Sequence, residues 1–184
     1  MNRKTWVLLA STLLLAGTAC GGGSGGVAGG AGGGSTNLAA SFVPAVTTPG
    51  PKTVSVAQVN SSGNMVTLQF NVKDTDDVHT AAFDVIFDDA LVEFVGHSKG
   101  TLLEQGGNVP LYQVAVSAGR VVVGVSRGGA VGADAIGSQS LLRVIFRVTN
   151  AGQSQLSVVN ATLRDGNLNS ITGVTWHGGS LIGS

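Results

Sequence analysis

The chain has only one cysteine among its 184 residues, so no disulfide can form within it. Charged side chains are also scarce, at 11% of the sequence, and the ten basic and ten acidic side chains cancel. No run of lysine or arginine occurs that could neutralise a row of phosphates, which argues against a nucleic-acid partner. We therefore expect a module that is held together by apolar packing and backbone hydrogen bonds alone.

Side chains suited to catalysis or to metal binding are few and scattered. Glu93 and Glu104 are the only glutamates, whereas most glycosidases place two carboxylates across a cleft. The three histidines, His79, His97 and His177, are too widely spaced to resemble a metal-ligand motif. The sequence therefore predicts a protein that is not an enzyme and that has no resident cofactor or metal.

The first 20 residues have the pattern of an export signal. Arg3 and Lys4 precede an apolar stretch, residues 6–16, which is too short to span a bilayer as a helix. Small residues then lead to Cys20. This resembles a bacterial lipoprotein signal, residues 1–19, which implies that Cys20 is lipidated and becomes the mature N-terminus. The alternative is an ordinary cleaved secretory peptide that ends beside an unmodified thiol.

Residues 20–51 have the composition of a flexible linker. Residues 21–34 are glycine, alanine and serine with a single valine, and such a segment cannot bury enough apolar surface to offset the loss of backbone entropy. Phe42 and Val43 could dock on the following domain, but the linker interpretation extends to residue 51. An anchor at Cys20 and this linker together predict an exported cell-envelope protein, most simply one of an outer membrane.

Residues 52–184 are enough for one domain with a substantial core. Apolar residues alternate with polar ones through most of this region, and turn residues recur every eight to twelve positions. This pattern predicts an all-β, antiparallel sandwich of about nine strands, with one short helical turn at 101–105. The expected strands are 54–59, 65–72, 81–87, 91–95, 111–117, 120–126, 141–148, 156–163 and 173–182.

Three segments resemble the cohesin family in the same order and at similar spacing. Residues 87–94, Phe-Asp-Asp-Ala-Leu-Val-Glu-Phe, are similar to the tyrosine-aspartate-proline-x-x-leucine turn of cohesin modules. Residues 141–148 are similar to the family's leucine-x-x-isoleucine-x-phenylalanine strand, and residues 161–182 are similar to its C-terminal strand, aspartate turn and closing strand. The resemblance covers about Lys52 to Ile182.

This resemblance implies a jelly-roll sandwich without catalytic activity. Cohesins bind a dockerin, a small calcium-loaded helical module, on the flat outer face of one sheet. By resemblance, that face uses the strands at 80–87, 111–117, 120–126 and 156–163. Alternation within the first three of these strands then gives the outward residues of a protein-binding face: Ala82, Asp84, Ile86, Gln113, Ala115, Val122, Gly124 and Ser126.

The predicted face is unusually apolar for a solvated sheet, and such patches tend to mark interaction sites. The alternative is that the glycine-rich loop between 126 and 139 covers it. A carbohydrate-binding module on the same fold, involved in polysaccharide binding or degradation, is a second functional hypothesis, and it requires an exposed Trp176. A structural envelope lipoprotein is a third. Asp74–Asp77 is expected to be a solvated loop, with a weak calcium site as the alternative.

Overall fold

A computed structural model describes residues 38–184 of the chain. The predicted signal, the lipidation site Cys20 and the glycine-rich part of the linker lie outside the described residues. Within 38–184, no helix has the length and apolar character needed to cross a membrane. Residues 38–184 contain every core residue described, so we expect this part of the chain to fold by itself as a unit.

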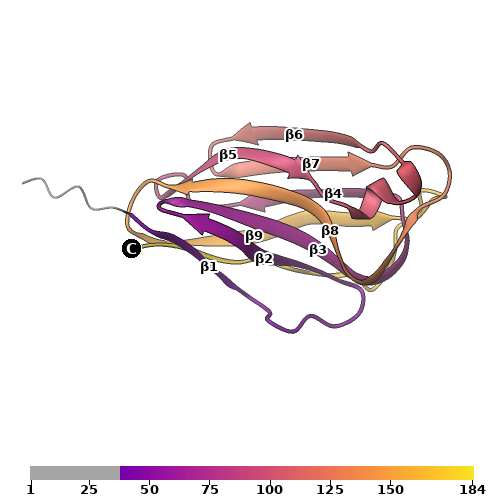
Figure 1. The fold of residues 1–184 in the computed structure, drawn as a ribbon, viewed down its shortest axis with the longest axis horizontal. Coiled ribbons are helices and arrows are strands. Elements are labelled where there is room, and N and C mark those ends of the chain that lie inside the picture. The colour runs from indigo at the N-terminus through magenta and orange to yellow at the C-terminus, as the bar shows by residue number, and fades with distance from the viewer. Residues whose placement is uncertain (1–37) are drawn as a thin grey trace, which may run out of the picture. The chain divides into compact units, whose positions relative to one another are not determined.

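The unit is a sandwich of two β-sheets, as the alternation predicted (Figure 1). The six-stranded sheet has the order β1-β11-β9-β4-β7-β6, and the five-stranded sheet has the order β10-β2-β3-β8-β5. A 3-10 segment, η1 (Leu102–Gly107), follows β5, close to the expected helical turn. The strands are β1 (Ala40–Pro44), β2 (Thr53–Ser62), β3 (Met65–Val78), β4 (Thr80–Ile86), β5 (Val92–Lys99), β6 (Leu111–Ser117), β7 (Arg120–Ser126), β8 (Ala133–Val148), β9 (Gly152–Arg164), β10 (Thr175–His177) and β11 (Gly179–Gly183).

The core lies between the sheets and is built from the inward rows of alternating strands. On β3 every second residue from Val66 to Val72 is at most 1% exposed. On β4 the inward row is Ala81, Phe83 and Val85, as expected. Burial of these rows supplies the main driving force for folding, at about 25 cal/mol for each Å² of apolar surface removed from water.

The linker prediction extends too far toward the domain. Residues 40–44 form β1, which pairs antiparallel with β11, so that Phe42 lies opposite Leu181. Phe42 is only 7% exposed, and its backbone N–H donates to the side-chain oxygen of Gln58 (2.8 Å). This correction has a simple cause. Ala40 and Phe42 alternate with polar or exposed neighbours, and burying the Phe42 ring offsets the entropy lost by ordering five residues.

The C-terminal strand expected at 173–182 is two strands in different sheets. β10 pairs with β2 in parallel, which makes the five-stranded sheet mixed and not purely antiparallel, and β11 pairs with β1 and β9. The chain crosses between the sheets at Gly178, where an added Cβ would lie only 1.9 Å from the backbone oxygen of Leu156. Only glycine fits this close crossing.

Asp77 and its neighbours are part of the fold and do not form the expected solvated loop. The Asp77 carboxylate accepts hydrogen bonds from the backbone N–H groups of Gly132 (2.7 Å) and Gly166 (3.1 Å). Asp74 likewise accepts from the backbone N–H of Gly137 (2.8 Å). These carboxylates therefore hold together three segments that are distant in sequence. In residues 38–184, no three acidic, histidine or cysteine side chains come together as a set of metal ligands.

Candidate protein-binding face

The outer surface of β9, β4, β7 and β6 carries all the residues predicted for the protein-binding face. Cross-strand register places Ala82 beside Gly124, and Gly124 beside Gln113. The next outward row contains Asp84, Val122 and Ala115 in the same way. The structure therefore brings the predicted residues into adjacent rows of one surface. We refer to this surface as the outer face.

Apolar side chains on the outer face are open to solvent. Ile86, Val122 and Val159 are 36%, 39% and 39% exposed. The loop suspected of covering them goes elsewhere, because its second half is the start of β8 and pairs with β3 in the opposite sheet. Its first half is held next to the start of β4, where Nε2 of His79, the residue before this strand, lies 2.8 Å from the backbone oxygen of Gly129.

A polar cluster lies in the middle of the outer face. Asp84 Oδ2 accepts hydrogen bonds from Arg120 Nη2 and from Asn160 Nδ2, both at 2.6 Å. The Asp84 side chain is only 5% exposed, because these two side chains cover it from the solvent side, while Arg120 is 46% exposed. Asp84 therefore organises the face and is not free to contact a partner, whereas Arg120 remains accessible.

The same contacts set the ionisation of Asp84. The Asn160 amide, more than the Arg120 guanidinium, stabilises the carboxylate and holds the Asp84 pKa below its ordinary value of 3.8, although burial opposes this. A carboxyl group with a lowered pKa in the folded state stabilises the fold above the unfolded-state pKa, and this contribution disappears as the pH falls through the folded-state pKa.

Replacing Asp84 with asparagine should therefore reduce stability near neutral pH and reduce it less at acid pH. Urea unfolding between about pH 6 and pH 2 measures this effect. The difference in the free energy of unfolding between the wild type and Asp84→Asn should shrink below about pH 4. Asp89→Asn is the matched control, because Asp89 is exposed in the turn after β4. An advantage that stays constant down to pH 2 would contradict the assigned role of the carboxylate.

Val159 and Asn160 belong to the outer face but were missed from the sequence. The pairing of β4 with β9 shifts between Ala82 and Asp84, and Asn160 has a positive φ of 51°. This bulge inserts one extra residue and changes which side chains point outward. The sequence does contain a signal for it. Leu156 and Leu163 are both buried but are an odd number of residues apart, which regular alternation does not allow.

A shallow hollow lies over the part of the outer face where the side chains are smallest. Its volume is about 210 Å³, and Ala82 and Gly124 lie within it. Leu111, which is 63% exposed, and Gln113 are on one side, and Thr80 and Ser126 complete the lining. Because a Cβ added at Gly124 would meet no atom within 4 Å, the hollow has room for a side chain from a partner.

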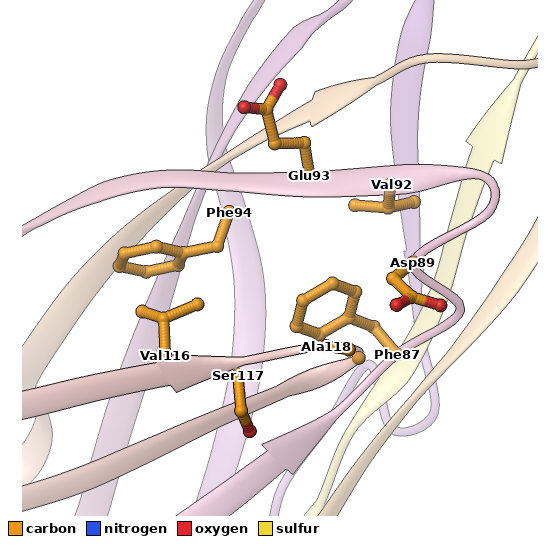
Figure 2. Close-up of a pocket in the computed structure, with 9 residues that line it drawn as sticks. Phe87, Asp89, Val92, Glu93, Phe94, Val116, Ser117 and Ala118 are labelled. Carbon is orange, nitrogen blue, oxygen red and sulfur yellow. The ribbon is translucent and has the colours of Figure 1, made fainter.

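A larger pocket of about 390 Å³ opens at the side of the sandwich, between β5 and the β6–β7 hairpin. Figure 2 shows the Phe87 and Phe94 rings and the Val116 side chain gathered below β5, with the Glu93 carboxylate on the other side of that strand. Glu93 is paired there with Arg147 at 2.8 Å. The lining is mostly apolar and does not bring two carboxylates face to face.

Two segments match the Gly-x-Ser-x-Gly pattern of serine hydrolases, at 96–100 and 124–128. In those enzymes the serine sits on a sharp turn from a strand into a helix. Here Ser98 lies within β5, paired with Arg143. Ser126 is 3.3 Å from Thr80 Oγ1, not bonded to His79. Within residues 38–184, no hydrogen bond joins either serine side chain to a base that would activate it.

Trp176, which the carbohydrate hypothesis requires on the surface, and Tyr112 both have structural roles. Trp176 is half-buried, and its ring centroid lies 5.2 Å from that of Phe83 in the core. The Tyr112 hydroxyl donates to the backbone oxygen of Leu141 (3.0 Å) and accepts from the backbone N–H of Gly100 (3.3 Å). Burial raises the pKa of Tyr112. The exposed Trp176 that the carbohydrate hypothesis requires is therefore not found.

The family model described as "Cohesin domain" matches residues 52–182. The chain belongs to the cohesin family. No curated protein matches the sequence. The family assignment inferred from the three sequence segments is thus confirmed, and so is the sandwich fold.

Solved cohesin structures resemble this one at low sequence identity. A non-cellulosomal cohesin from the archaeon Archaeoglobus fulgidus is 22% identical, with a TM-score of 0.51 over 64% of this chain and 80% of the other. The sixth cohesin of scaffoldin B from Acetivibrio cellulolyticus, solved with a mutant Cel5 dockerin, is 17% identical, with a TM-score of 0.56 over 69% and 95%. A type II cohesin domain from the same organism is 15% identical, with a TM-score of 0.56 over 79% and 95%. At these identities the likeness establishes the fold alone.

Proposed function

We propose that this cohesin is a non-catalytic receptor that binds a dockerin-like helical module on its outer face. The observation that carries this proposal is the apolar surface around Ile86, Val122 and Val159, which the described part of the chain leaves exposed, in a protein of this family. Exposed apolar patches on a stable domain tend to be interaction sites. Solved cohesins with dockerins bound, such as the Acetivibrio cellulolyticus complex, support the choice of partner class.

The outer face offers two kinds of contact to such a partner. Its apolar residues and the hollow over Gly124 would take up the apolar side of a helix, in the way that a central apolar patch dominates many interfaces. Arg120 and Gln113 lie beside this patch and retain groups that can hydrogen-bond. The Asp84 carboxylate already accepts hydrogen bonds from Arg120 and Asn160. Binding of a helical module would therefore not leave this carboxylate buried without a hydrogen-bond donor.

We extend the proposal to the N-terminal region. Lipidation at Cys20 would anchor the chain to a membrane of the cell envelope, most simply the outer membrane, and residues 21–39 would connect the anchor to the folded unit. A flexible connection of this length spans about 25 Å on average. Metabolic labelling with a radioactive fatty acid would test this, since Cys20→Ser should remove the label and leave the folded unit intact.

The binding proposal is tested by replacing Ile86 with aspartate. Residues 36–184 would be immobilised and exposed to calcium-loaded dockerin modules encoded in the same genome. We expect at least one module to bind the wild type, and Ile86→Asp to weaken that binding by about tenfold or more, because a carboxylate would be buried against apolar groups. Val59→Asp is the matched control, because Val59 is 47% exposed on β2 of the opposite sheet.

Two results would count against this function. If no dockerin module binds the wild type, the proposed partner class is wrong. If a module binds equally well to wild type, Ile86→Asp and Val59→Asp, the partner class is right but the outer face is not the docking surface.

A further inference from the structure

The edge strands of the two sheets differ in how well they are protected against pairing with another strand. Natural proteins blunt such edges with short strands, charges, prolines or bulges. β1 has five residues and ends at Pro44, and β10 has three residues. β5 carries Glu93 and Lys99 and has a bulge between Phe94 and Gly96. Among the edges of the described sheets, these three are therefore protected.

The fourth edge strand, β6, lacks all of these devices. Its seven residues, Leu-Tyr-Gln-Val-Ala-Val-Ser, include no charge and no proline, and its register with β7 is unbroken. Leu111 and Val116 are 63% and 53% exposed. Figure 1 shows β6 at the margin of the sandwich, with β7 on its one paired side. In antiparallel pairing, alternate residues direct their N–H and C=O groups away from the paired neighbour, so β6 offers a row of such groups.

We propose that β6 pairs antiparallel with β6 of a second copy of this chain, about a two-fold axis at Val114. This register places Tyr112 opposite Val116 of the partner copy, so the exposed valine gains an apolar neighbour. On the outer side it places Gln113 opposite Ala115 of the partner copy. All seven residues of β6 take part in the pairing, and no like charges of the two strands face each other.

The sequence of β6 favours a second copy over an unrelated strand. Its inward row, Tyr112, Val114 and Val116, is apolar at all three positions, so it complements itself under two-fold rotation. A seven-residue strand pair buries less area than a standard stable interface, and we therefore expect a weak dimer, with a Kd between about 10 µM and 1 mM.

The dimer would have a geometric consequence. Because the two-fold axis is perpendicular to the extended sheet, both outer faces would lie on the same side. The paired sheets would present two copies of the hollow over Gly124 to one partner assembly. A protein with two linked helical modules would then be held at both sites, and its apparent affinity would rise without any new contact.

The proposal is tested on residues 36–184 by sedimentation velocity up to about 1 mM, the upper end of the Kd expected for so small an interface. We expect dimers that increase with concentration. Val116→Lys should weaken the dimer by about tenfold or more, because it places a charge in the seam. Val43→Lys is the matched control, since Val43 is 54% exposed on β1, the opposite edge of the same sheet. Circular dichroism would verify that both variants fold.

A disulfide experiment tests the register directly. Residues 36–184 contain no cysteine, so Val114→Cys introduces a single thiol at the two-fold axis. Directly opposed residues have Cβ atoms about 4.5–5.5 Å apart, close enough for a small adjustment to allow a disulfide. Air oxidation should link Val114→Cys into dimers faster than Val43→Cys. A chain that stays monomeric up to 1 mM, a dimer unaffected by Val116→Lys, or equal crosslinking of the two cysteine variants would overturn the proposal.

Discussion

Replacing Gly124 with arginine should weaken the proposed binding of a dockerin-like module by a factor of about a hundred or more, while leaving the folded unit as stable as the wild type. The reason is steric. An added Cβ at Gly124 would meet no atom within 4 Å, so the free protein accommodates the side chain. The same side chain would fill the hollow between Leu111 and Thr80 and would hold a flat partner away from the sheet.

The chain offers a matched control for this substitution. Gly96 lies on β5 in the opposite sheet, and an added Cβ there would also meet nothing within 4 Å. Surface plasmon resonance with a dockerin that binds the wild type should show loss for Gly124→Arg and no change for Gly96→Arg. Thermal unfolding of both variants should remain near that of the wild type. Retained binding by Gly124→Arg would place the contact surface elsewhere.

The largest expected effect on stability comes from Phe146→Ala. Phe146 lies on β8, is fully buried, and packs edge to face against Phe87 and Phe94, with ring centroids 5.2 and 6.0 Å away. Its removal would leave a cavity between the sheets, and such truncations cost about 3–5 kcal/mol. Most domains of this size are stable by only about 5–15 kcal/mol, so the variant should be near the limit of folding.

Urea denaturation of residues 36–184 measures this effect. Val95→Ala is a suitable control, because Val95 is 41% exposed on β5 beside the same cluster. Its midpoint should move little, as is usual for surface positions, where changes stay within about 0.5 kcal/mol. A decrease of less than about 1 kcal/mol in the free energy of unfolding of Phe146→Ala would contradict this prediction. It would mean that the neighbouring strands fill the cavity far more readily than a close-packed core allows.

Alternation of apolar residues predicted most of the sandwich because each strand has one buried side. On β4 the inward and outward rows follow directly from the order of residues, and the predicted outward residues Ala82 and Ile86 lie where expected. The cohesin-like segments at 87–94 and 141–148 indicated the family. The resemblance to the family then indicated which sheet carries the protein-binding face. Those inferences depend only on local sequence.

Other features depend on contacts between distant segments, and sequence reasoning failed there. The residues of β1 were assigned to the linker. The contacts that order Phe42, with Leu181 and Gln58, come from segments that are distant in the sequence. Asp77 looked like a loop residue, but its carboxylate bonds two backbone groups that are 55 and 89 positions away. No local pattern contains this information.

The sequence alone determined an all-β domain of the cohesin family, because strand periodicity and short turn motifs are written in neighbouring residues. Only the tertiary structure decided that residues 38–184 leave the outer face uncovered and that the Asp84 carboxylate is paired with Arg120 and hydrogen-bonded by Asn160. It also decided that β6 is the unprotected edge. The reason is physical, since exposure, ion pairing and edge position are set by which strands become neighbours, and strand order is a property of the whole folded chain.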